Sequence, residues 1–168
     1  ILYNKMKILT KNQIEAKKQF YVKEIKKGKI FIYPTDTIYG IGCDATNPKA
    51  IIKIRRIKNR ETKPFSIIAP SKEWIKENCE ISKKASEWLN KLPGPYTFIL
   101  KLKNKKAIAQ RTNNNGETVG VRIPKNWFAD LIAEINIPFI TTSVNLSGES
   151  PIISLQDLKE EIKKSVDY

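Results

Sequence analysis

Short apolar runs alternate along the whole chain with longer segments whose apolar residues recur at helical spacing. Each run is soon followed by proline, glycine or a group of hydroxyl side chains, as at Tyr33-Pro34 and Thr141-Thr142-Ser143. Apolar runs of this kind are typical of buried strands, but the helical segments between them are too unevenly placed for uniform βαβ units. We therefore predict α/β architecture, a single domain whose twisted mixed sheet carries flanking helices.

The expected strands cover residues 29–33, 66–69, 96–102, 119–123 and 138–142, and the expected helices cover 10–27, 47–58, 71–78, 82–92, 126–135 and 154–165. Residues 35–47 are predicted to form a loop, and the polar stretch 103–118 is predicted to be mobile. The domain is expected to span 7–168. Because Met6 is the only methionine, residues 1–6 are interpreted as an N-terminal extension or a cloning remnant.

Missing residue types exclude several classes of chemistry. The chain has no histidine, which excludes Ser-His-Asp and Cys-His catalysis as well as histidine-ligated metal sites. Two cysteines, Cys43 and Cys79, are too few for a structural zinc site or a disulfide framework, so we expect a reducing, cytoplasmic location. No apolar run is long enough to span a membrane.

Lysine and arginine number 31 against 17 acidic residues, which gives a formal net charge of +14. A charge of this sign favours an anionic partner such as a nucleotide or nucleic acid. The alternative is that an AT-rich genome has raised the lysine content without functional meaning. The placement of the charges is therefore more informative than their sum.

Two segments are candidate anion or ligand sites in the first half of the chain. Pro34-Thr35-Asp36-Thr37 directly follows a predicted strand and precedes Gly40, which is typical of a ligand-binding loop, although on pattern alone a turn that only satisfies its own backbone fits somewhat better. Lys58, Arg60 and Lys63 end a basic helix and lead into the next strand. They could clamp a polyphosphate or could form a solvated basic face.

Two further segments lie in the second half. Strand alternation places Arg122 on the same face as Gly120 and Thr118, a small polar face suited to lining a cavity or simply to facing water. Residues 141–150 are rich in hydroxyl and amide side chains directly after a strand, which indicates either a polar crevice or a long turn.

Taken together, these segments resemble the YrdC-like family, the L-threonylcarbamoyladenylate synthases, in its short single-domain form. The resemblance rests on motifs that come in the family's order and spacing, namely Pro34-Thr35-Asp36-Thr37-Ile38-Tyr39-Gly40, Lys58-x-Arg60-x-x-Lys63, Pro93-Gly94-Pro95-Tyr96-Thr97, Thr118-Val119-Gly120-Val121-Arg122 and Ser143-Val144-Asn145-Leu146-Ser147-Gly148. One departure is Val144, where the family usually has alanine.

The resemblance implies a sheet that encloses a basic cavity and a nucleotidyltransferase that makes threonylcarbamoyl-AMP and pyrophosphate. Its substrates would be L-threonine, bicarbonate or CO2, and ATP accompanied by Mg²⁺, with no zinc. The product would be passed to a separate threonylcarbamoyl-transfer complex for the t6A modification of tRNA. Direct binding of tRNA by this chain is left open, and no membrane partner is expected.

The resemblance also implies roles for individual residues, and it identifies no metal-ligating side chain. Lys58 and Arg60 would be catalytic. ATP contacts would come from Lys58, Arg60, Lys63, Thr118, Ser143, Asn145 and Ser150, and contacts to threonine from Thr35, Arg122 and Thr141. No role is assigned to Asp36. The stretch 103–115 would lie at the cavity edge and could act as a lid.

Other functions remain open at this point. A double-stranded RNA or tRNA binding module would use the same basic concavity without consuming ATP. A catalytically diverged paralogue would keep the fold and lose the activity. The carbamoyl-adenylate enzymes of hydrogenase maturation contain a related domain, but those proteins are much longer and rich in cysteine. The presence of Lys58, Arg60, Ser143 and Asn145 favours activity.

Overall fold

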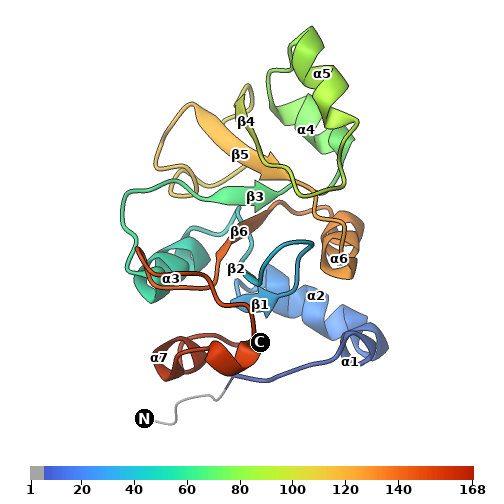
Figure 1. The fold of residues 1–168 in the computed structure, drawn as a ribbon. Coiled ribbons are helices and arrows are strands. Elements are labelled where there is room, and N and C mark those ends of the chain that lie inside the picture. Colours follow the sequence, from blue (N-terminus) through green and yellow to red (C-terminus); the bar gives the residue numbers. More distant parts are fainter. Residues whose placement is uncertain (1–5) are drawn as a thin grey trace.

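The computed structural model describes residues 6–168, and its centre is a six-stranded sheet with the order β1-β2-β6-β3-β5-β4 (Figure 1). The strands are β1 (Phe31–Tyr33), β2 (Gly40–Gly42), β3 (Ser66–Ile68), β4 (Phe98–Lys101), β5 (Thr118–Arg122) and β6 (Phe139–Ser143). β3 and β5 are parallel, and the other neighbouring pairs are antiparallel. The predicted α/β domain with a mixed sheet is confirmed.

Helices cover both faces of this sheet (Figure 1). On one face, Ile51 and Ile54 share a buried apolar cluster with the strand residues Ile67, Val121 and Ile140. On the other face, aromatic side chains dominate a second cluster. The helices are α1 (Lys11–Ala16), α2 (Lys18–Lys26), α3 (Pro48–Lys58), α4 (Lys72–Asn78), α5 (Lys83–Leu89), α6 (Trp127–Ile135) and α7 (Glu160–Lys163).

The second cluster covers only part of its sheet face. Phe128 of α6 stacks on Tyr33 with ring centroids 4.2 Å apart, and both rings contact Phe139. Further along the same face, Ser66 pairs with Gly120 on one side and with Thr141 on the other. The side chains of directly paired residues point to the same side of a sheet. Ser66, Gly120 and Thr141 therefore form a polar region on the same sheet face as the aromatic cluster, beyond the part that the helices cover.

β2 lies inside the segment that the sequence predicts as a loop. Gly40–Gly42 pairs with both β1 and β6, and its backbone is buried. Glycine is normally unfavourable in strands, but a Cβ at Gly42 would lie 1.7 Å from the carbonyl oxygen of Ile140. The missing side chain therefore allows a close approach of two backbones, which a propensity argument does not detect.

The region before the C-terminus also differs from the prediction. In place of one helix over 154–165, the chain forms a 3₁₀ turn, η1 (Leu155–Asp157), followed by the short α7. Leu158 separates them with an extended ψ of 121° and is only 3% exposed. Burial of Leu158 and Ile162 in the core therefore outweighs continuation of the helix.

The predicted helix over 10–27 is divided at Lys17, whose ψ of 34° lies outside the helical region, although its predicted capping box at Thr10 and Gln13 forms.

The predicted mobile stretch 103–118 is anchored at its centre. Ile108 and Thr112 are buried, and the Thr112 hydroxyl donates to the carbonyl of Ala45 at 3.1 Å. Such anchoring disfavours a lid that includes these residues.

The predicted N-terminal extension lies outside the described residues except for Met6, which packs against the core. Within residues 6–168, no helix combines the length and the apolar character needed to cross a bilayer.

Two glycines test the packing argument. Gly42→Ala should lower the free energy of unfolding by about 3 kcal/mol, because its methyl group would collide with the Ile140 carbonyl and force β2 away from β6. Gly148→Ala has open space around it but a φ of +91°, so about 1 kcal/mol is expected. Urea denaturation measures both values. Equal losses at the two sites would contradict the packing argument.

Candidate active site

A small cavity opens where the polar part of the sheet face meets the loop between β1 and β2. Its volume is about 120 Å³. Hydroxyl groups dominate the lining and Arg122 adds a guanidinium; the hydroxyl residues include Thr35, Ser66, Thr97, Thr141, Thr142 and Ser143. Hydroxyl groups donate and accept hydrogen bonds, so the lining suits a ligand rich in polar oxygen atoms.

Strand register brings these residues together from distant parts of the chain. Ser143 is paired with Gly40, which places the end of β6 beside the Thr35 loop. Ser66 lies between Thr141 and Gly120. A Cβ at Gly120 would lie 2.4 Å from the Ser66 hydroxyl oxygen, so the glycine makes room for that hydroxyl on the cavity wall.

Arg122 enters the cavity from the end of β5. Its Nη2 donates to Oδ1 of Asp36 at 2.7 Å, and the two side chains are only 15% and 13% exposed. The Arg122 Nε is buried and has no hydrogen-bond acceptor among the described residues. A buried N–H without an acceptor is costly, which favours a site whose ligand supplies one.

Arg60 contacts the cavity wall through Thr142. Its Nη1 donates to the Thr142 hydroxyl at 3.3 Å and its Nη2 donates to the Pro64 carbonyl at 2.6 Å. The guanidinium lies over the Phe65 ring, 5.0 Å from its centroid. Burial lowers the pKa of Arg60. Its Nε is the second buried donor that lacks an acceptor within residues 6–168.

Lys58 is almost fully buried, with 2% of its surface exposed. Its ammonium group donates to the carbonyl of Ser143, to the carbonyl of Asn145 at 2.9 Å and to Oδ1 of Asn145 at 3.0 Å. Burial, and secondarily the charge of Arg60, lowers the pKa of Lys58 to about 8. All three ammonium hydrogens therefore hold the turn after β6, and this lysine determines where that turn lies.

The turn is also bonded within itself. The Ser143 hydroxyl donates to Oδ1 of Asn145 at 2.5 Å, and Nδ2 of Asn145 donates to the carbonyls of Leu146 and Glu149 at 2.9 and 2.7 Å. Polar groups that already have partners are held in defined positions, which is what a preorganised binding site requires.

The structure separates the predicted site residues into three groups. Those that line the cavity are Thr35, Arg122, Thr141 and Ser143, and those that contact its wall or each other are Lys58, Arg60 and Asn145. The side chains of Lys63, Thr118 and Ser150 are exposed and lie outside the cavity lining. Ser150 instead shares a separate surface hollow with Asn145. The ATP contacts assigned to these three residues remain predictions.

Sequence reasoning assigned no role to Ser66, Thr97 or Thr142, which all line the cavity. Ser66 is the most instructive, because it begins an apolar strand and looks like a boundary residue. Strand alternation could have indicated it, since Ser66 and Ile68 share a face opposite to Ile67. The pairing partner that makes this face polar, however, is set by the sheet order.

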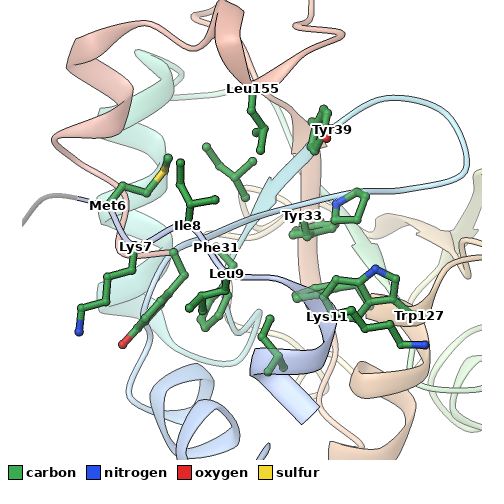
Figure 2. Close-up of a pocket in the computed structure, with 15 residues that line it drawn as sticks. Met6, Lys7, Ile8, Leu9, Lys11, Phe31, Tyr33, Tyr39, Trp127 and Leu155 are labelled. Carbon is green, nitrogen blue, oxygen red and sulfur yellow. The ribbon is translucent and has the colours of Figure 1, made fainter. Parts of the chain in front are cut away.

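A second cavity, of about 250 Å³, lies beside the first and has a different character (Figure 2). Its wall is built mainly of aromatic and aliphatic side chains, including Phe31, Tyr33 and Trp127. Tyr39 lines both cavities. Lys7 and Lys11 stand at the rim and extend away from the centre in Figure 2. Its wall thus lacks the group of serine and threonine hydroxyls that lines the first cavity.

The lowered pKa of Lys58 predicts a pH effect on stability. Unfolded lysine keeps its proton up to about pH 10.5, whereas folded Lys58 keeps it only to about pH 8. Between these values the unfolded state binds more protons, so the contribution of Lys58 to the free energy of unfolding should increase as pH rises from 8 to 10.5. Urea denaturation of the wild type and Lys58→Met across this range measures it. A pH-independent difference between the two proteins would contradict the prediction.

The family profile described as "Telomere recombination", that of Sua5, YciO and YrdC, matches residues 23–168. A protein from Methanocaldococcus jannaschii named putative threonylcarbamoyl-AMP synthase is 40% identical over 173 residues, which covers 99% of this chain and 80% of that protein.

Solved structures agree with this similarity. A doubly substituted P. abyssi Sua5 superposes with a TM-score of 0.81 at 27% identity, over 91% of this chain and 48% of that chain. P. abyssi Sua5 complexed with L-threonine gives 0.76 at 26% identity, over 91% and 44%. The chain thus spans about half the length of the Sua5 chains it matches. With its family motifs gathered around one cavity and most of its length matched, the chain belongs to the Sua5/YciO/YrdC family.

Proposed function

We propose that this chain is an L-threonylcarbamoyl-AMP synthase, which forms threonylcarbamoyl-AMP and pyrophosphate from L-threonine, bicarbonate or CO2, and ATP for the t6A modification of tRNA. The observation that carries the proposal is a hydroxyl-lined cavity flanked by two arginines, each with a buried Nε that lacks an acceptor among the described residues. Two such donors suit substrates that carry carboxylate and phosphate groups.

In this proposal, the two sides of the cavity bind different substrates. Arg122 would bind the threonine carboxylate, with Thr35 and Thr141 contacting the rest of the amino acid. Arg60 would hold the phosphates beside Ser143 and its turn, and ATP would arrive with Mg²⁺ bound to its phosphate oxygens. Exposed Lys63 lies on the same basic segment as Arg60 and would meet the outer phosphates.

The chemistry needs no covalent enzyme intermediate. The unprotonated threonine amine attacks CO2 and forms a carbamate, with loss of one proton to solvent. A carbamate oxygen then attacks the α-phosphorus of ATP, and the bond to the bridging oxygen breaks as pyrophosphate leaves. The protein contributes positioning of three reactants and stabilisation of negative charge on the phosphorus centre. Buried cations act strongly in this role because little water screens them.

Several partners follow from the same proposal. The product must pass to a separate threonylcarbamoyl-transfer complex, in the cytoplasm where ATP and tRNA are found. The formal charge of +14 is compatible with direct tRNA contact. An RNA-binding module without catalysis, or a diverged paralogue, would show no pyrophosphate release, so the same assay separates these alternatives.

Pyrophosphate release is the direct test of the activity. Release should require ATP, L-threonine and bicarbonate together, and omission of any one should abolish it. Arg60→Ala should lower the turnover number by on the order of 10²-fold, because the variant loses charge stabilisation at the transition state. The matched control is Arg56→Ala, an exposed arginine on α3 that should leave turnover unchanged. Release without threonine, or near-normal release by Arg60→Ala, would reject the assignment.

Arg122→Ala tests the amino-acid side of the cavity. Its affinity for L-threonine should fall at least about tenfold, because a charged hydrogen bond to the carboxylate is lost, while affinity for ATP should stay the same. Isothermal titration calorimetry measures both. Lys125→Ala, which removes a nearby exposed cation, serves as the control. An unchanged threonine affinity in Arg122→Ala would assign the carboxylate to another group.

A further inference from the structure

Asp36 lies behind Arg122 and outside the lining of the cavity, within the described part of the chain. Its Oδ1 accepts the hydrogen bond from Arg122 Nη2 at 2.7 Å, and its Oδ2 accepts from the backbone N–H of Lys125 at 3.0 Å. Both carboxylate oxygens thus have donors. The carboxylate is tied to the backbone just before α6, and its direction is set by that tie.

The consequence for Arg122 is geometric. Arginine side chains are long and lose much conformational freedom when they bind a ligand in one orientation. The anchored carboxylate of Asp36 holds one side of the guanidinium, and the 15% exposure of the arginine shows how closely the pair is enclosed. Nε is buried and has no acceptor among residues 6–168.

Asp36 also connects two parts of the site. Its neighbour Thr35 lines the cavity, and the Thr35 hydroxyl donates to the carbonyl of Ile38 at 2.6 Å and accepts from the amide of Thr37 at 3.1 Å. One short loop therefore presents a hydroxyl to the cavity and, from the next residue, a carboxylate to Arg122.

We propose that Asp36 is a positioning residue that holds the Arg122 guanidinium in the orientation that binds the carboxylate of the amino-acid substrate. The inference rests on the proposed function, because it assumes that Arg122 meets that carboxylate. Asp36 lies outside the cavity lining, and its carboxylate is directed at Arg122 and at the backbone of Lys125. It acts through Arg122.

The test compares Asp36→Asn with wild type, using two ligands in calorimetry. L-threonine carries the carboxylate, and L-threoninamide replaces it with an uncharged amide. In Asp36→Asn, affinity for L-threonine should fall about tenfold, because an asparagine amide no longer holds the guanidinium by charge. Affinity for L-threoninamide and for ATP should stay within about twofold, a difference too small for one charged hydrogen bond.

Asp130→Asn is the matched control, because this aspartate is exposed on α6 and the substitution changes the same charge. It should leave all three affinities unchanged. A ligand-free readout accompanies the calorimetry: the ¹H–¹⁵N resonance of Arg122 Nε should shift and exchange faster with water in Asp36→Asn than in wild type.

The outcomes separate this inference from the function on which it rests. If wild type binds L-threonine and Asp36→Asn binds it equally well, the positioning role is wrong and the proposed function stands. If both amino-acid ligands weaken equally, Asp36 supports the pocket in general and not the carboxylate contact, which also overturns the inference. A wild type that neither binds L-threonine nor releases pyrophosphate rejects the proposed function, and the inference with it.

Discussion

The pairing of β6 with β2 on one side and β3 on the other is the constraint on which the site depends. It aligns Ser143 with Gly40 and Thr141 with Ser66, although these partners are widely separated in the sequence. The close approach of β6 to Gly42 permits this arrangement, because a side chain there would collide with the Ile140 carbonyl. Aromatic packing by α6 covers one half of the resulting face and leaves the polar half open.

Around that open half, the protein buries cations by three different means. Lys58 donates to carbonyl and amide oxygens, and Arg122 donates to the carboxylate of Asp36. Arg60 donates to a hydroxyl and a carbonyl and lies over an aromatic ring. The partners of Lys58 and Arg60 are neutral, so they accept hydrogen bonds without cancelling the positive charges. The side of the cavity near these two residues therefore keeps a positive potential. Such a potential favours anionic substrates, and the burial of these cations also lowers the pKa of Lys58.

Much of this arrangement could be predicted from local patterns. Strand alternation correctly placed Arg122 with Gly120 on a polar face, and β3, β5 and β6 follow apolar runs that are visible in the sequence. Other features could not be predicted locally. Gly40–Gly42 looks like a loop until its paired strands are known. Leu158 leaves the helical conformation because its side chain is buried in the core. Ser66 lines the cavity only because of the strands with which β3 pairs.

The sequence by itself therefore determined the fold class, the classes of chemistry excluded by the missing histidines, and the segments that carry cationic and hydroxyl groups. These properties depend on residue type and short-range period, which are local. Only the tertiary structure decided which of these groups share a cavity, that the Lys58 ammonium holds a turn, and that Asp36 lies behind Arg122. Those facts depend on strand order and on contacts between distant residues, and a linear pattern contains neither.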